Sequence, residues 1–113
     1  MFDGQPKRVI IYAMADGTCP LDVWRAGLRG EEALARIEKR LNRLLRGNPG
    51  DYKSVGGGVY ELRIDYGPGY RLYCAFAGQQ LVLLLCGGSK ATQNADIKNA
   101  QAYWEDYQKR VKP

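Results

Sequence analysis

The 113-residue sequence predicts one α+β domain, residues 1–113, in which helices pack on one face of a mainly antiparallel, twisted sheet. Two observations predict this class. Residues 60–86 contain two runs of alternating polar and apolar residues and one apolar run, separated by glycine-containing turns, as in a three-stranded meander. On either side of this segment, apolar residues recur every three or four positions, as in amphipathic helices. Residues 1–7 have no apolar run and are expected to be flexible.

The segment before the meander predicts a strand and two helices. Residues 9–13, VIIYA, are typical of a strand buried on both faces. Pro20 suits the first turn of a short helix, where a missing N–H has no cost. A longer helix is expected from Glu31, whose charge suits the positive end of a helix dipole, to Gly47, which suits a C-terminal cap. The apolar stripes of the two helices are Leu21, Trp24 and Leu28, and Leu34, Ile37, Leu41, Leu44 and Leu45. We expect an αα-hairpin, then an edge strand at 51–55 and a flexible glycine loop at 56–58.

Side-chain alternation selects a register for the first hairpin of the meander. A three-residue loop, residues 67–69, pairs Tyr66 with Tyr70 and keeps the apolar side chains of both strands on one face. A four-residue loop would instead place Arg71 opposite Ile64 and turn a charge into the core. The expected apolar pairs are Ile64 with Leu72, Leu62 with Cys74, and Tyr60 with Phe76.

The end of the sequence predicts a buried strand and a closing helix. Residues 81–86, LVLLLC, are apolar throughout, which indicates a central strand covered on both faces. Gly87 and Gly88 end this strand and allow a tight turn into Lys90. Thr92 is a candidate N-cap for the helix. The apolar stripe of the helix is Ile97, Ala100, Trp104, Tyr107 and Val111, and its supporting ion pairs are Glu105–Lys109 and Asp106–Arg110.

Composition restricts the chemistry that this chain can perform. There is no histidine, so catalysis would have to use lysine, arginine, tyrosine or carboxylates. The formal net charge of +5 favours an anionic partner such as nucleic acid, although a basic protein without such a partner is equally compatible with it. Three cysteines without close spacing argue against a disulfide framework and a zinc site. The longest apolar run, 81–86, is far too short to cross a membrane, so a cytoplasmic protein is expected.

Two stretches of the chain resemble a known toxin superfamily. Residues 61–73, ELRIDYGPGYRLY, and residues 83–93, LLLCGGSKATQ, are similar to the RelE/ParE superfamily. The similarity is greatest to its phage-derived "addiction module killer protein" branch, which is HigB-like. In that branch the pattern runs roughly E-L-R-x-x-x-G-x-G-Y-R-x-Y and then L-L-x-G-G-x-K-x-x-Q. The resemblance spans about Arg8 to Tyr107 and implies the element order β-α-α-β-β-β-(β)-α, with an N-terminal helical hairpin and a C-terminal helix.

The resemblance implies the toxin of a type II toxin–antitoxin system. RelE-like members cut mRNA in the ribosomal A site, so a ribosome-dependent mRNA endonuclease without metal or cofactor is the first expectation. The implied partners are the ribosome, mRNA and a cognate antitoxin, which is often a small helix-turn-helix protein. DNA would be contacted only through the antitoxin complex. A ParE-like gyrase inhibitor, which acts by binding, and an inert protein with a toxin fold are the alternatives.

The family's cleft residues correspond, by motif position, to three basic residues of this chain. These are Arg63, Arg71 and Lys90, the expected catalytic residues, with Lys53 and Tyr73 as expected substrate-binding residues. Arg71 would clamp the phosphate because its planar fork matches phosphate oxygens. Lys90 would act as the base if neighbouring cations lower its pKa. The best-studied nucleases carry a Tyr or His where this chain reads TQNAD at residues 92–96.

Purely structural interpretations of these residues stay open. In the predicted register Arg63 and Tyr73 are cross-strand neighbours, with Asp65 and Arg71 beside them. The two arginines would then pair with Glu61 and Asp65 across the strands. Tyr73 would be a packed strand aromatic and Lys90 a solvated loop lysine. The long helix carries a further basic set, which is either its solvated face or a docking surface for ribosomal RNA or an acidic antitoxin: Arg36, Lys39, Arg40, Arg43 and Arg46.

Overall fold

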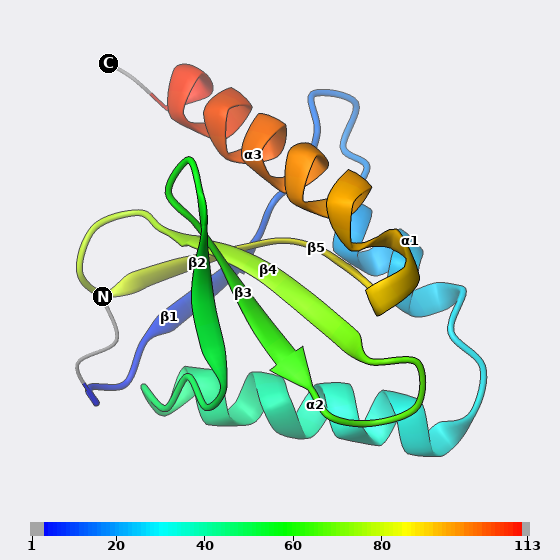
Figure 1. Cartoon of the computed structure of the whole chain (residues 1–113). Coiled ribbons are helices and arrows are strands. Elements are labelled where there is room, and N and C mark those ends of the chain that lie inside the picture. The colour runs from blue at the N-terminus through cyan, green and yellow to red at the C-terminus, as the bar shows by residue number, and fades with distance from the viewer. Residues whose placement is uncertain (1–3, 112–113) are drawn as a thin grey trace.

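The chain folds into one five-stranded sheet with helices on both of its faces, as the computed structural model of the protein shows for residues 4–111 (Figure 1). The elements are β1 (Arg8–Ile11), α1 (Pro20–Ala26), α2 (Glu31–Leu45), β2 (Tyr52–Gly56), β3 (Val59–Ile64), β4 (Tyr70–Phe76), β5 (Leu81–Gly88), the 3₁₀ turn η1 (Lys90–Thr92) and α3 (Gln93–Arg110). Their order confirms the predicted α+β class, including the edge strand before the meander and the closing helix.

The sheet is antiparallel except at one edge. Its strand order is β1-β5-β4-β3-β2, and β1 runs parallel to β5. The prediction that the first strand is buried on both faces is wrong, because β1 is an edge strand and its Ile10 and Ile11 are each 38% exposed. A run of apolar residues does not by itself distinguish an edge strand from a central one. β5 is covered on both faces, as predicted.

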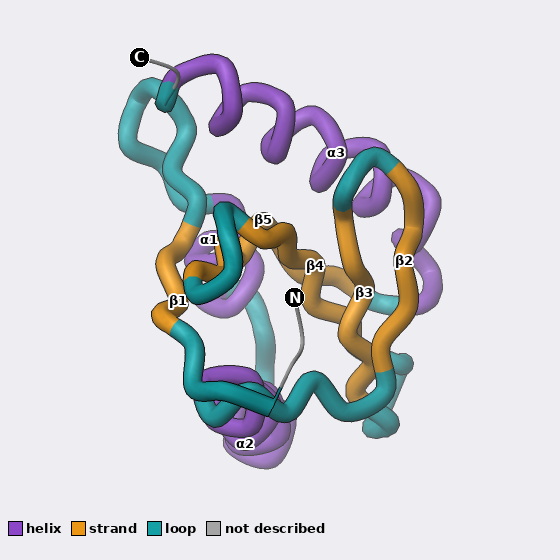
Figure 2. Tube along the Cα trace, turned by 90° about the vertical axis from the view of Figure 1, so that its left-hand side faces the viewer, coloured by secondary structure: helices purple, strands orange, loops and turns teal. Residues whose placement is uncertain are grey.

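The helices cover both faces of the sheet, so the prediction that they pack on one face is wrong. Figure 2 shows α2 on one side of the strands and α3 on the other. The α1 and α2 side buries Leu21 and Ile37 against Leu62 and Leu72. The α3 side is a second core, whose members are Tyr12, Val59, Tyr73, Ala75, Leu83, Leu85, Cys86 and Ala100. The face that carries Glu61, Arg63 and Tyr73 is therefore partly interior.

The register of the β3–β4 hairpin differs from the predicted one by two residues. Ile64 pairs with Tyr70 and Leu62 with Leu72, so the loop is residues 65–69. This loop contains its own turn, because the Gly69 N–H donates to the Tyr66 carbonyl and Tyr66 leaves the ladder. The odd loop length, and with it the shared apolar face, is as predicted. The expected pairing of Arg63 with Tyr73 is wrong: Arg63 lies opposite Arg71, and Glu61 lies opposite Tyr73.

The predicted helix boundaries are confirmed, with corrections near their ends. Gly47 has a positive φ of 86° and closes α2 with a Schellman motif, since its N–H donates to Leu44 and that of Asn48 donates to Arg43. Leu45 and Val111, predicted as members of the apolar stripes, are exposed. Thr92 precedes α3, but its hydroxyl accepts from the Ser89 N–H and donates to Asp96 instead of capping α3. The two predicted ion pairs of α3 form at 3.1 and 2.9 Å.

Gly87 and Gly88 have a different role from the expected turn. Both lie inside β5, without a positive φ, at points where a helix comes close to the strand. A Cβ on Gly87 would lie 2.3 Å from the Trp24 ring of α1, and one on Gly88 would lie 1.8 Å from the Asp96 carboxylate of α3. These glycines therefore make room for helix packing on the two faces of the strand.

The N-terminal segment was predicted to be flexible over residues 1–7. Residues 1–3 lie outside the described part of the chain. Within the described part, Lys7 is buried, its N–H donates to the Leu45 carbonyl, and its ammonium donates to the Gln79 carbonyl at 3.0 Å. The flexibility of this segment stays a prediction.

Candidate functional site

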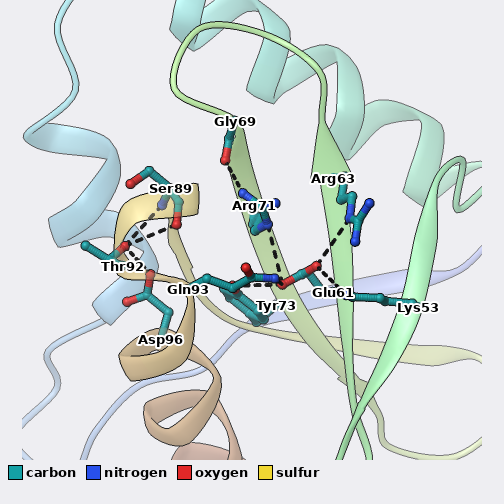
Figure 3. Close-up of polar contacts among 10 residues, drawn as sticks. All are labelled: Lys53, Glu61, Arg63, Gly69, Arg71, Tyr73, Ser89, Thr92, Gln93 and Asp96. Carbon is teal, nitrogen blue, oxygen red and sulfur yellow. Dashed lines mark hydrogen bonds and ion pairs between the residues drawn. The ribbon is translucent and has the colours of Figure 1, made fainter.

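A buried carboxylate, Glu61, is the centre of the polar cluster that contains most of the expected site residues (Figure 3). Glu61 lies in the middle of β3 and is fully buried. Its Oε2 accepts hydrogen bonds from the Tyr73 hydroxyl at 3.1 Å and from the Gln93 amide at 2.8 Å. The cluster thus joins β3, β4 and the first turn of α3.

Arg71 is held beside this carboxylate from the neighbouring strand. It is 8% exposed, and its Nη1 donates to the Gly69 carbonyl at 2.7 Å. Its Nε lies 3.6 Å from Glu61 Oε2, too far for a good hydrogen bond, and finds no other partner within residues 4–111. The guanidinium is therefore fixed in place while one of its donors stays unsatisfied.

Arg63 and Lys53 approach the other oxygen of Glu61. Arg63 Nε donates to Oε1 at 3.5 Å, and Lys53 Nζ, on the edge strand β2, lies 3.9 Å from the same oxygen. Both side chains are nearly half exposed, unlike that of Arg71. Both distances to Glu61 are long and both cations keep contact with solvent, so these two side chains can turn toward an anion in solvent.

Tyr73 is brought into the cluster but does not reach solvent. Its ring is fully buried in the core under α3, and its hydroxyl faces Glu61. Burial and the Glu61 carboxylate beside it raise the pKa of Tyr73 far above its ordinary value. In this conformation the ring has no free face on which a base can stack, so Tyr73 contacts the rest of the site through Glu61.

Lys90, in the turn η1 after β5, lies near Gly69 but does not line the pockets of the described residues. Its backbone N–H donates to the Pro68 carbonyl at 3.3 Å, and its side chain is exposed. A Cβ on Gly69 would be 3.3 Å from Arg71 Nη1 and 3.5 Å from Lys90 Cβ. The Arg71 guanidinium and the base of the Lys90 side chain therefore both lie close to Gly69.

The electrostatic balance of the cluster is positive. Arg63, Arg71 and Lys53 surround one carboxylate, Glu61. Burial acts to raise the pKa of Glu61, but the hydrogen bonds from Gln93 and Tyr73 and the charges of Arg71 and Lys53 outweigh it and hold this pKa below its usual value. Glu61 is therefore a firmly ionised anchor and a poor proton acceptor, and two of the three cations are not neutralised by it.

A pocket opens beside this cluster, with a volume of about 290 Å³. Arg63 and Arg71 line it, together with Asp51, Ile64, Asp65, Gly69 and Tyr70. This volume is near the lower end of the range of small-ligand pockets, about 300–1,000 Å³. The site can thus present two guanidinium groups to an anion, which is the chemistry of phosphate binding.

Sequence reasoning missed two members of the site, Glu61 and Gln93. Glu61 was considered only as a partner for surface ion pairs, and Gln93 was not considered at all. Both nevertheless occupy fixed letters of the family pattern, the E of E-L-R and the Q that ends G-G-x-K-x-x-Q. The family pattern therefore already contained both residues. The structure shows why they occur together, because the Gln93 amide donates to Glu61, 32 residues earlier in the sequence.

Within residues 4–111 no group of three or more His, Cys, Asp or Glu side chains is arranged to hold a metal ion. Over the same range, no helix has both the length and the apolar character needed to cross a membrane. Cys19, Cys74 and Cys86 are free thiols, the latter two buried in β4 and β5.

Comparison with known proteins gives a family match and one similar relative. Residues 30–105 match the family model described as "Phage derived protein Gp49-like (DUF891)". The chain is also 50% identical, over 84 residues, to an uncharacterised protein of Haemophilus influenzae; the match covers 74% of this chain and 85% of that protein. The matched region extends from the start of α2 into α3 and includes the whole Glu61 cluster.

Proposed function

We propose that this chain, which belongs to the Gp49-like family of phage-derived proteins, is the toxin of a type II toxin–antitoxin system and cleaves mRNA on the ribosome. The observation that carries the proposal is Arg71, a buried guanidinium with an unsatisfied Nε at a pocket that it shares with Arg63. A buried, preorganised cation of this kind stabilises negative charge that develops on a phosphate. The resemblance of residues 61–73 and 83–93 to RelE-like toxins supports the same activity.

The proposed chemistry is attack of a ribose 2′-OH on the adjacent phosphorus. This forms a 2′,3′-cyclic phosphate and breaks the bond to the 5′ oxygen of the next nucleotide, which takes a proton from solvent water. Arg71 clamps the phosphate and stabilises the phosphorane, and Arg63 supports it from the more exposed side of the pocket. Lys90, near Gly69, is the proposed base for the 2′ proton. Lys53 binds a neighbouring part of the RNA, and no histidine takes part because the chain has none.

Glu61 and Tyr73 act on the substrate indirectly in this scheme. The Glu61 carboxylate forms an ion pair with Arg71 inside the protein. Hydrogen bonds from Tyr73 and Gln93 in turn fix the orientation of this carboxylate. A guanidinium fixed in this way loses little rotational freedom when it binds a phosphate. These residues are therefore positioning residues, and Tyr73 positions the substrate only through Glu61 and Arg71.

The proposed biological setting follows from the toxin function. The partner that silences the toxin is expected to be a small helix-turn-helix antitoxin, and DNA is expected to be contacted only through the complex with it. The protein is proposed to work in the cytoplasm, where ribosomes and mRNA are found.

The test is cell-free translation of a reporter with the purified protein, followed by primer extension on the mRNA. We expect new 5′ ends that require ribosomes and that disappear with Arg71→Ala. Lys109→Ala, which removes an exposed cation of α3 far along the chain from the pocket, is the matched control and should cleave like the wild type. If Arg71→Ala does not fold, as judged by circular dichroism, Arg63→Ala tests the same pocket through a more exposed side chain. Intact mRNA and normal translation with the wild-type protein would overturn the proposal, and gyrase cleavage would be assayed next.

A further inference from the structure

A second basic pocket is lined by residues of α2, of the end of β3 and of the segments next to β3. α2 lies on the face of the sheet opposite α3 (Figure 1). The volume of this pocket is about 270 Å³. Five basic side chains line it, against two acidic ones: Arg36, Lys39, Arg40, Arg43 and Arg63, with Asp51 and Asp65. The basic face of α2 is thus one wall of a hollow and not only a solvated surface.

Arg40 forms a buried part of this pocket and carries a hydrogen-bond donor that the described residues leave unused. It is 5% exposed, and it bridges α2 to the strands, since its Nε donates to the Arg63 carbonyl at 3.1 Å and its Nη2 to the Asp51 carbonyl at 2.8 Å. Its Nη1 is buried without a hydrogen-bond partner among the described residues. Burial and the charge of Arg43 lower the pKa of Arg40, despite the opposing effect of Asp51.

The second pocket adjoins the pocket of the Glu61 cluster. Four residues line both pockets: Asp51, Arg63, Ile64 and Asp65. Arg63 stands between them, with its backbone carbonyl bound by Arg40 and its guanidinium near Glu61. An extended anion that occupies both pockets would therefore pass Arg63 at their shared boundary.

We propose that the α2 pocket binds a phosphate of the single-stranded RNA that flanks the cleaved phosphate in the Arg71 pocket. This inference rests on the proposed function and names how the same site takes its substrate. RNA fits both pockets because it carries one negative charge per nucleotide along a flexible chain, so consecutive phosphates can occupy adjoining basic hollows. The guanidinium groups that dominate the lining match phosphate oxygens in pairs.

The test measures binding of a single-stranded 2′-O-methyl RNA oligonucleotide, which lacks the attacking hydroxyl and therefore stays intact. Fluorescence anisotropy at several salt concentrations gives the slope of log Kd against log salt. The double variant Lys39→Ala/Arg43→Ala removes two exposed cations of the pocket and leaves Arg40 in place. For single strands the slope changes by about 0.7 per phosphate neutralised, so loss of the one phosphate bound in this pocket should lower it by about 0.7.

The matched control is Arg29→Ala/Arg46→Ala, which removes two exposed cations that line neither pocket. It should keep the wild-type slope. Equal slopes for the two double variants would overturn the inference. So would a Lys39- and Arg43-dependent affinity for an acidic peptide without one for the oligonucleotide, since this would identify a protein-binding surface.

A second readout follows Arg40 itself by the NMR signal of its Nε–H group. We expect the oligonucleotide to shift this signal in the wild type but not in Lys39→Ala/Arg43→Ala. A shift with inorganic phosphate alone, and none with the oligonucleotide, would show a free-phosphate site and overturn the RNA assignment.

The proposed function and this inference fail in different ways. If the wild type cuts mRNA but the slopes are equal, only the α2 pocket assignment fails. If the slopes differ as expected but no mRNA is cut, the α2 pocket assignment stands as RNA binding, and the proposed cleavage fails.

Discussion

Glu61 and Tyr73 lie directly opposite each other on β3 and β4, and the tyrosine hydroxyl donates to Glu61 Oε2 at 3.1 Å inside the protein. Neither side chain is exposed. Two residues before Tyr73 on the same strand, Arg71 lies 3.6 Å from the same carboxylate oxygen. One cross-strand pair thus links the core under α3 to the guanidinium that lines the pocket.

Removal of the Glu61 carboxylate is predicted to destabilise the fold strongly. Glu61→Ala leaves the buried Arg71 guanidinium without its counter-ion and the Tyr73 hydroxyl without its acceptor. Loss of one partner of a buried ion pair costs roughly 3–5 kcal/mol, and we expect the free energy of unfolding to fall by an amount in this range. Urea denaturation followed by circular dichroism measures it.

The control for this variant is Glu105→Ala, which breaks the exposed pair with Lys109 on α3. Exposed pairs of this kind contribute about 0.3–0.5 kcal/mol, so the control should be nearly as stable as the wild type. If the two variants lose similar amounts, Glu61 is not the anchor that its burial indicates.

The lowered pKa of Glu61 predicts a specific acid sensitivity. A carboxylate whose pKa is depressed by folding stabilises the protein fully above its unfolded-state pKa, about 4.3. This contribution is lost as the pH falls below that value and through the folded-state pKa of Glu61. We expect the stability of the wild type to decrease between about pH 5 and pH 3 more steeply than that of Glu61→Gln, which cannot titrate. Parallel curves from urea denaturation at each pH would contradict the assignment.

The sequence predicted the elements well but not the β3–β4 register, for a physical reason. Periodicity is local, so strands 59–64 and 70–76 are visible in the alternation of single residues. Alternation fixes only whether the loop length is odd, and loops of three and five residues satisfy it equally. The loop has five residues because a turn starts at Tyr66, whose carbonyl accepts a hydrogen bond from the Gly69 N–H.

The second core and the Glu61 cluster were harder to predict for a related reason. Glu61, Arg63 and Arg71 look like residues of a solvated face because charges seldom occur inside proteins. In this fold, however, Glu61 and Arg71 form an ion pair inside the protein, next to the α3-side core to which Tyr73 belongs. The continuous apolar strand 81–86 was the clue, since a strand apolar on both faces requires a helix on both faces.

Close packing of Trp24 over β5 predicts that Gly87 does not tolerate a side chain. A Cβ at Gly87 would lie 2.3 Å from the indole ring, so either α1 or the strand must move. Overpacking of this kind costs about 1–3 kcal/mol. We expect Gly87→Ala to lower the free energy of unfolding, measured by urea denaturation, by an amount in this range or above it. Gly27→Ala is the matched control, because its Cβ would find ordinary contacts at 3.6 and 3.8 Å from carbonyl oxygens of α1. Equal stability of the two variants would show that Trp24 does not pack as described.

The three cysteines are predicted to differ sharply in reactivity. Burial raises the pKa of both Cys74 and Cys86 to about 12, so almost no thiolate forms at neutral pH. Cys19 is only partly buried at the start of α1. We expect Ellman's reagent to modify one thiol in the native protein and three in urea, and Cys19→Ser to remove the native reaction. Fast modification of a second thiol in the native protein would show that the sheet opens locally.

Tyr73→Phe separates positioning from direct chemistry at the proposed active site. The ring is fully buried and its hydroxyl is bound to Glu61, which still accepts from Gln93 in the variant. If Tyr73 acts only by orienting Glu61 and Arg71, ribosome-dependent cleavage should slow by no more than about tenfold, which corresponds to 1.4 kcal/mol. The pH profile of cleavage should stay unchanged, because no group that transfers a proton in the reaction is lost. Loss of a general acid or base typically costs about 10²- to 10⁴-fold. A decrease of that size, with an altered pH profile, would mean that the hydroxyl reaches the substrate and that the core under α3 opens during the reaction.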